Sequence, residues 1–179
     1  AGSTSDVPVT GADLYPTLLD LCGLPLRPEQ HVDGVSLKPL FSGGQIDERP
    51  LYWHYPHYGN QGGEPHAIVR DGQWKLIHYY EDGRNELYDL ASDTGETSDV
   101  SRTLPAKTLE MWNNLDRWLT DVGAVRPKPD PRYDAEKTEA FYRNIHTKTK
   151  ERLEKFHSQI LEADWQPNPD WWGSLRAKD

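Results

Sequence analysis

The residue types that could recognise a ligand are concentrated in one run of the chain, residues 52–63 (YWHYPHYGNQGG). The run holds two histidines, His54 and His57, followed by an amide pair, Asn60 and Gln61. Imidazole and carboxamide groups donate hydrogen bonds to sulfate or sugar oxygens, and glycines let a backbone approach a ligand closely. The run therefore suits an anionic or hydroxyl-rich ligand. The alternative is that His54 and the tyrosine rings are core residues and the glycines only make a turn.

Other catalytic constellations have little support in this sequence. Four histidines fall within one stretch: His54, His57, His66 and His78. A zinc site would use such ligands, but their spacing matches no strong template and no cysteine accompanies them. The chain contains no Gly-x-Ser-x-Gly elbow and no phosphate-binding loop, and its paired carboxylates lie in expected turns. These patterns disfavour a metal site on this chain, a serine hydrolase and a glycosidase dyad.

The elements that hold this run are expected to be short β-strands. Four β-type runs are expected at residues 51–55, 66–70, 73–80 and 84–90. Asp71-Gly72 predicts a type I′ hairpin turn, which needs positive φ at both central residues, and residues 81–83 predict a slightly longer turn. The four runs should form an antiparallel meander. Both faces of the third strand are partly apolar, so another element must cover at least one of them.

A helix over residues 105–122 is the expected cover for this sheet. Its apolar stripe comprises Leu109, Trp112, Leu115 and Leu119. Pro105 suits the first turn of a helix, where a missing N–H is tolerated, and Gly123 suits its end. The predicted fold class is therefore α+β, a four-stranded antiparallel sheet packed on a C-terminal helix.

The flanking segments divide the chain further. Residues 13–23 predict a helix with an apolar stripe of Leu14, Leu18 and Leu21, with Asp13 as N-cap. The expected organisation is residues 1–23 as the end of a preceding domain, 24–50 as a connector with one helical turn near 36–40, 51–123 as the sheet-and-helix subdomain, 124–134 as a Pro-rich linker and 135–179 as a helical extension with an aromatic tail. The extension should be one helix over residues 135–163, lying on a surface, followed by a docked coil.

Composition limits the possible partners. The 179 residues carry 20 Lys and Arg against 29 Asp and Glu, a formal net charge of −9, with no basic stripe, which disfavours nucleic acid. A hydrophobic content of 35% and a mean hydropathy of −0.85 predict one modest core with polar appendages. No apolar run approaches the roughly 20 residues that span a bilayer, and no signal peptide opens the sequence. The abrupt start suggests the interior of a longer protein. The single cysteine, Cys22, is expected to be a small buried residue.

The order of motifs resembles the C-terminal region of the sulfatases, the arylsulfatase branch of the alkaline phosphatase superfamily. Five motifs carry the resemblance: DLYPTLLDLCGLP at 13–25, DGVSL at 33–37, RPLYWHYP at 49–56, AIVRDGQWKLI at 67–77 and ELYDL at 86–90. The resemblance covers about residues 8–123 and does not extend beyond residue 124. It implies a large α/β catalytic domain upstream, of which residues 1–23 would be the end, and a smaller C-terminal subdomain with four strands and a helix.

The resemblance also implies a chemistry that this chain does not contain. Sulfatases use a formylglycine, made from the first residue of a Cys/Ser-x-Pro-x-Arg motif, and a calcium ion held by Asp and Asn. Cys22 is followed by Gly-Leu, so it does not match that motif. The expectation is therefore a sulfuric ester hydrolase as the full-length protein, with nucleophile and calcium ligands outside this chain and no cofactor in it. By resemblance the enzyme is secreted or periplasmic.

What remains for this chain is to support the catalytic domain and to shape the substrate pocket. The resemblance implies that the substrate-binding side chains are His54 and His57, with Asn60 and Gln61 behind them, and that the substrate is a sulfate ester or sulfated glycan. Two rival hypotheses remain. One is a phosphonate or phosphodiester hydrolase of the same superfamily, and the other is a free-standing carbohydrate-binding module, suggested by the 7 Trp and 9 Tyr residues.

Overall fold

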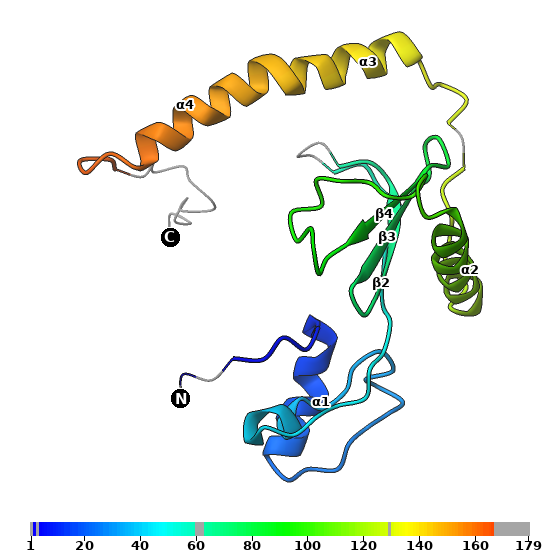
Figure 1. Cartoon of the computed structure of the whole chain (residues 1–179). Helices are drawn as coiled ribbons and strands as arrows, with labels where there is room; N and C mark the ends of the chain where they lie inside the picture. Colours follow the sequence, from blue (N-terminus) through cyan, green and yellow to red (C-terminus); the bar gives the residue numbers. More distant parts are fainter. Residues whose placement is uncertain (1, 3, 60–62, 129, 167–179) are drawn as a thin grey trace, which may run out of the picture. The chain divides into compact units, whose positions relative to one another are not determined.

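The computed structural model describes residues 2, 4–59, 63–128 and 130–166. The chain divides into two compact units: residues 1–59 with 63–127 form the first, and residues 60–62 with 128–179 form the second. The first unit contains the sheet and its covering helix, and the second contains the helical extension (Figure 1).

The first unit is built on a four-stranded antiparallel meander (Figure 1). Its strands follow one another in the order of the sequence: β1 (Leu51–Tyr55), β2 (His66–Asp71), β3 (Trp74–Tyr79) and β4 (Asn85–Asp89). Each strand pairs with the next in an antiparallel manner; the loop of residues 56–65 connects β1 to β2, and shorter turns connect the other strands. The predicted meander and its four strands are confirmed.

The turn between β2 and β3 differs from the prediction. Asp71 pairs with Trp74, so the two residues of the loop are Gly72 and Gln73, not Asp71 and Gly72. Gly72 has a φ of +56°, and it is the residue here that needs the left-handed region. Because Gln73 keeps a negative φ, the turn has one positive φ at its first central residue, as in type II′, rather than the two of type I′.

One face of the sheet is covered by the helix α2 (Pro105–Asp121) (Figure 1). The fully buried core that the two elements share comprises Ala67, Val69, Leu76, Leu87, Met111, Leu115 and Leu119. The prediction of Leu109 in this core was wrong, since its side chain is 58% exposed. Leu109 lies six residues before Leu115, which at about 100° per residue places it about 120° away around the helix, whereas Met111 lies only about 40° away.

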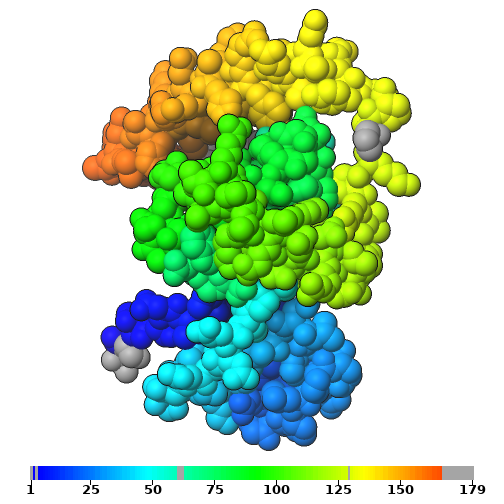
Figure 2. All heavy atoms as spheres, turned by 45° about the vertical axis from the view of Figure 1, so that its right-hand side comes forward, coloured from blue at the N-terminus to red at the C-terminus, as the bar shows by residue number. Residues whose placement is uncertain are grey.

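The segment before the sheet contains three helical pieces: η1 (Gly11–Asp13), α1 (Leu14–Leu21) and η2 (Lys38–Ser42). Residues 14–42 gather into one cluster, drawn from blue to cyan in Figure 2. Pro16 lies in the first turn of α1, as predicted, and the helical turn expected near residues 36–40 is observed as η2. The apolar stripe of α1 is not buried within this unit, because Leu14 and Leu18 are each 60% exposed and Leu21 is 50% exposed. Cys22 is exposed as well, contrary to the expectation of a buried thiol.

Asp13 precedes α1 but does not cap it as predicted. Its carboxylate accepts a hydrogen bond from the backbone N–H of Thr10, three residues earlier, instead of from the first turn of α1. The same carboxylate accepts from the N–H of Val35 and pairs with Arg49. Asp13 therefore links α1 to the far end of the connector.

The second unit is a helical rod rather than the single regular helix that was predicted. It consists of α3 (Ala135–Asn144), a π-helical turn η3 (Ile145–Thr149) and α4 (Lys150–Ile160) (Figure 1). The carboxylate of Asp134 caps α3 by accepting from the N–H of Lys137 at 3.1 Å. The helix ends at Ile160, three residues before the predicted end. Of the coil predicted after residue 163, residues 167–179 lie outside the described residues.

Candidate functional site

Strand alternation separates the two histidines that were predicted to act together. Along β1, Tyr52 and His54 face α2, whereas Trp53 and Tyr55 face the other side of the sheet. His57 lies beyond the strand, is exposed, and has its ring 5.6 Å from the ring of Tyr55 in an edge-to-face arrangement. The structure thus brings His57 to the open side of the sheet and keeps His54 on the core side.

The other two predicted contact residues, Asn60 and Gln61, lie outside the described residues. Within the loop of residues 56–65, the Gly59 N–H donates a hydrogen bond to the Gly63 carbonyl oxygen at 2.8 Å. The Tyr80 N–H donates to the Pro65 carbonyl oxygen at 3.0 Å, which fixes the end of the loop to the end of β3.

A charged cluster also fixes the end of this loop. Glu64 accepts from both terminal nitrogens of Arg84, at 3.0 and 3.2 Å, and Asp82 and Glu86 pair with the same guanidinium. Arg84 lies over the ring of Tyr79, 3.7 Å from its centroid. Burial, with the Glu86 carboxylate beside it, raises the pKa of Tyr79 to about 12, so the phenol stays neutral at physiological pH.

His54 has neighbours that belong to the core. The strand register places His54, Ala67, His78 and Asn85 in one row across the sheet. His78 Nδ1 lies 2.8 Å from Asn85 Oδ1, and its ring packs against Trp112 of α2 with centroids 4.1 Å apart and planes tilted by 33°. Burial lowers the pKa of both His54 and His78 below the ordinary value of 6.5, so both imidazoles are neutral at pH 7.

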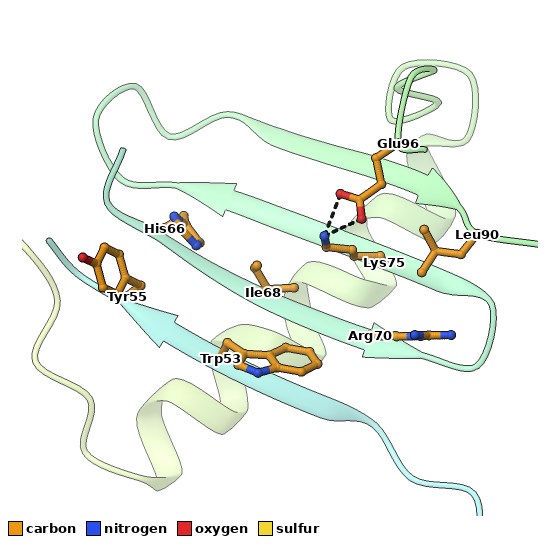
Figure 3. A pocket seen from close by; sticks show the side chains of 8 residues that line it. All are labelled: Trp53, Tyr55, His66, Ile68, Arg70, Lys75, Leu90 and Glu96. Atoms are coloured by element: carbon orange, nitrogen blue, oxygen red, sulfur yellow. Dashed lines mark hydrogen bonds and ion pairs between the residues drawn. The ribbon is translucent and has the colours of Figure 1, made fainter. Parts of the chain in front are cut away.

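The open face of the sheet carries a pocket of about 570 Å³. Its lining combines aromatic, aliphatic and charged side chains, drawn in Figure 3: Trp53, Tyr55, His66, Ile68, Arg70, Lys75, Leu90 and Glu96. Trp53 and Tyr55 are 41% and 43% exposed, although rings of this size are commonly buried. The pocket is therefore an aromatic surface to which another molecule or another part of the protein can bind.

Of the two cationic side chains that line the pocket, Lys75 and Arg70, Lys75 forms an ion pair within it. Lys75 Nζ donates to both carboxylate oxygens of Glu96, at 2.7 and 2.6 Å (Figure 3). Glu96 has a φ of +53°, a backbone conformation that costs energy for a residue with a side chain, and the ion pair helps to hold it. Arg70 belongs to none of the ion pairs found among residues 4–59, 63–128 and 130–166. Its guanidinium remains able to bind a carboxylate or sulfate.

Sequence reasoning missed this pocket, although one signal could have found it. Side chains alternate between the two faces of a strand, so the sequence of β1 places Trp53 and Tyr55 on the face opposite Tyr52. The prediction considered the two faces of the third strand only. Arg70 and Glu96 gave no such signal, because their placement depends on the pairing of β2 with β3 and on the loop after β4.

Two further features can be stated for the described part of the chain. No group of three or more His, Cys, Asp or Glu side chains there is arranged to hold a metal ion, so the four clustered histidines of the sequence do not meet at one point. None of the helices in these residues is both long and apolar enough to cross a membrane.

Comparison with known proteins identifies the family of the sheet-and-helix unit. Residues 1–123 match the family described as "N-sulphoglucosamine sulphohydrolase, C-terminal". The chain belongs to this sulphohydrolase C-terminal family. The resemblance to sulfatases inferred from the five motifs is thereby confirmed, as is the α+β fold with its four-stranded sheet.

Relatives of this sulphohydrolase family member are sulfatases. A sulfatase of Formosa agariphila is 34% identical over 122 residues, which make up 60% of this chain and 22% of the relative. Arylsulfatase K of Rattus norvegicus is 32% identical over 123 residues, 64% of this chain and 21% of the relative. A solved 2-O GAG sulfatase has a TM-score of 0.55 and 28% identity over 67% of this chain and 27% of that one. The chain thus spans about a fifth of the length of the curated relatives it matches.

Proposed function

We propose that this chain is the C-terminal portion of a sulfuric ester hydrolase, in which it supports an upstream catalytic domain and forms part of the wall of the substrate pocket. The observation that carries the proposal is the outward-facing stripe of α1. An amphipathic helix normally buries such a stripe, and fully burying a leucine contributes about 1.5–3 kcal/mol. Leu14, Leu18 and Leu21 remain 50–60% exposed, which is the surface expected of a helix that completes another domain.

The open face of the sheet supports the same proposal. Trp53 and Tyr55 line its pocket and remain 41% and 43% exposed, whereas α2 covers the opposite face. We assign both surfaces, the α1 stripe and the open face, to contact with the protein's own upstream catalytic domain. Arg70 would then face a carboxylate or another acceptor on that domain.

The contribution to substrate binding is assigned to the loop of residues 56–65. His57 is exposed at the open side of the sheet, two residues after the end of β1, and the loop is held by the bond from Gly59 N–H to Gly63 O and, at its exit, by the bond from Tyr80 N–H to Pro65 O, so the imidazole can be presented at a defined place. His57 is proposed to donate a hydrogen bond to a sulfate or sugar oxygen, with Asn60 and Gln61 near it in sequence. His54 is proposed to act from the base of the loop, because its side chain lies on the core side. A solved neighbour that is a 2-O GAG sulfatase supports a sulfated glycan as substrate.

The reacting groups are assigned to the upstream domain. Calcium takes about six to eight oxygen ligands, and the described residues contain no cluster of Asp and Glu arranged to hold a metal ion, so a calcium site does not fit them. No Cys/Ser-x-Pro-x-Arg motif occurs in the sequence. Secretion or export to the periplasm, as the resemblance implies, is part of the proposal.

Replacement of His57 in the full-length protein tests the pocket assignment. His57→Ala should lower kcat/KM for the sulfated substrate by about tenfold to a hundredfold, because it removes one hydrogen bond to a charged group. His157→Ala, an exposed histidine of α4, is the matched control and should leave the rate unchanged. An unchanged rate for a folded His57→Ala variant would refute the assignment. Assays on a phosphonate monoester in parallel separate the sulfatase proposal from the rival hydrolase of the same superfamily.

The free-standing carbohydrate-binding module is a second candidate function. The pocket of the open face favours it, because exposed Trp53 and Tyr55 rings beside Arg70 suit stacking on an anionic sugar. A module of this kind would be monomeric on its own and would bind sulfated oligosaccharides through these rings.

A further inference from the structure

One side of the helical rod carries a row of exposed side chains that all donate hydrogen bonds. The rod is the run of α3, η3 and α4 in Figure 1. Five side chains separated by four, four, three and four residues make up the row: Asn144, Lys148, Arg152, Lys155 and Gln159. Each lies about one helical turn from the next, so the five face the same side of the rod. They are called the donor row below, and no carboxylate belongs to it.

The three cations of the donor row belong to none of the ion pairs in the part of the chain that the structure describes. Two other cations of the rod do pair with carboxylates one turn away, Arg143 with Glu139 and Lys150 with Glu154. Glu151, one turn before the last cation of the row, forms no ion pair within the same residues. The positive charge of the row is therefore not neutralised by its own helix.

The spacing of these cations is unfavourable for a helix that binds nothing. Lys148 and Arg152 lie four residues apart, and Arg152 and Lys155 lie three apart, spacings at which like charges repel and destabilise a helix. Residues 143–157 contain five of the chain's 20 Lys and Arg side chains but only two of its 29 Asp and Glu. The sequence showed no basic stripe, because these side chains are not contiguous and only the helix aligns them. An anion bound along the row would remove the repulsion.

The length and chemistry of the donor row indicate what kind of anion fits it. From Asn144 to Gln159 the row extends over fifteen residues, about 22 Å at 1.5 Å per residue, which suits a linear polyanion better than a single ion. Ammonium and guanidinium groups bind sulfate and carboxylate, and the carboxamides at both ends can donate to hydroxyl oxygens. The row offers no apolar side chain to a lipid surface and no aromatic ring on which a nucleic-acid base could stack.

We propose that the donor row binds the chain of a sulfated glycan, away from the ester that is hydrolysed. The glycan as ligand rests on the proposed function of the full-length protein, whereas the unpaired cationic row is a property of this chain alone. A second contact of this kind raises the local concentration of a polymer that is already held at one point. It therefore favours long sulfated chains over short ones.

Fluorescence anisotropy of a labelled heparin dodecasaccharide, titrated with the full chain at several salt concentrations, tests the proposal. Affinity should fall with salt with a log–log slope of about 2–3 in magnitude, because three cations displace about that many counterions. Lys148→Gln/Arg152→Gln/Lys155→Gln should weaken binding by at least about tenfold and reduce the slope toward zero. Glutamine has a helix propensity close to that of Lys and Arg, so circular dichroism should show an unchanged helix content. A wild-type chain that does not bind heparin would overturn the proposal.

The matched control removes the same charge from cations that already have partners. Lys107→Gln/Arg143→Gln/Lys150→Gln replaces two Lys and one Arg as well, and each of the three forms an ion pair with a glutamate. This variant should bind heparin as the wild type does. Equal losses in the two triple variants would show a general effect of net charge and would refute the donor row.

Other polyanions and the turnover assay separate the remaining outcomes. Single-stranded DNA or phosphatidylserine vesicles that bind as tightly as heparin, with the same dependence on the row, would refute a sulfated glycan as the ligand. Turnover of a short sulfated substrate by the full-length protein should not change when the donor row is replaced. Loss of turnover in His57→Ala without any heparin binding by the chain would refute the donor row alone, and the reverse pair of results would refute the pocket assignment alone.

Discussion

The buried carboxylate of Asp13 connects three separate segments of the first unit. Its side chain has no exposed surface, yet it accepts hydrogen bonds from the N–H groups of Thr10 and Val35, both shorter than 3 Å, and pairs with Arg49. Thr17 adds a second link, because its hydroxyl donates to the Asp13 carbonyl oxygen and accepts from the N–H of Leu37. These bonds connect the start of α1, the middle of the connector and the residues that enter β1.

Removing this carboxylate should destabilise the first unit strongly. Asp13→Ala leaves the Arg49 guanidinium, which is only 19% exposed, without its counter-charge, so the free energy of unfolding should fall by about 3–5 kcal/mol. Urea unfolding followed by circular dichroism measures the change. The exposed Asp33 of the same connector is the control, and Asp33→Ala should change stability by less than about 0.5 kcal/mol. Equal effects of the two substitutions would contradict the role of Asp13.

The candidate site was predictable residue by residue only in part. The residue types of the run 52–63 pointed to a binding loop, and the structure does place His57, exposed, in a loop whose exit is fixed by the bond from Tyr80 N–H to Pro65 O. The same residue types could not say that His54 faces α2, because that depends on which face of the sheet the helix covers. The substrate role of both histidines remains a prediction.

The packing of α2 on the sheet forms the hydrophobic core of the first unit. A stripe of Met111, Leu115 and Leu119, spaced four residues apart, covers the fully buried side chains of β2, β3 and β4. Tyr52 of β1 extends this contact, because its ring stacks on Trp118 with centroids 4.7 Å apart and planes within 5° of parallel. Sequence periodicity predicted the helix and its bounds within one residue, but it included Leu109 in place of Met111.

Two leucines of α2 should therefore respond differently to the same substitution. Leu115→Ala removes a fully buried side chain from a packed core and should cost about 2–5 kcal/mol of unfolding free energy. Leu109→Ala removes a side chain that is 58% exposed and should cost less than about 1 kcal/mol. Chemical denaturation of both variants gives the comparison. A larger loss for Leu109→Ala would show that α2 is rotated relative to the sheet.

The helical extension departs from regular α-helical geometry at one turn, which the sequence periodicity did not predict. Phe141, Ile145 and Leu153 belong to one apolar stripe, but their spacings of four and eight residues drift around a regular α-helix, which has 3.6 residues per turn. The π-turn η3 between Ile145 and Thr149 accommodates one additional residue at this point. The additional residue reduces the angle around the helix axis between the apolar stripes of α3 and α4. The sequence pattern had suggested a single uninterrupted helix.

The whole molecule combines a strong negative charge with large exposed apolar side chains. A net charge of −9 favours solubility through mutual repulsion, whereas the α1 stripe and the open face favour association. Both surfaces are the ones assigned above to the upstream domain. The behaviour of the isolated chain therefore discriminates between a domain that needs this partner and a free-standing binding module.

The isolated chain should self-associate through its apolar surfaces. Sedimentation velocity should detect oligomers that grow with salt concentration, because salt screens the repulsion between chains but not the hydrophobic contact. Leu14→Gln/Leu18→Gln should shift the distribution toward monomer, whereas Leu109→Gln, an exposed leucine on α2, should not. A strictly monomeric chain that binds sulfated oligosaccharides would instead favour the carbohydrate-binding module.

The local elements could be read from the sequence alone: the four strands, the helix behind them, the places of the turns and the order of motifs that identifies the family. These follow from side-chain periodicity and turn residues, which act over a few neighbouring positions. Four features became visible in three dimensions: the α1 stripe faces outward, Met111 rather than Leu109 enters the core, Glu96 pairs with Lys75, and His54 and His57 lie on different sides of the sheet. Each of these depends on contacts between residues far apart in the chain. Periodicity shows which side chains share a face, but the element packed against that face decides which of them are buried.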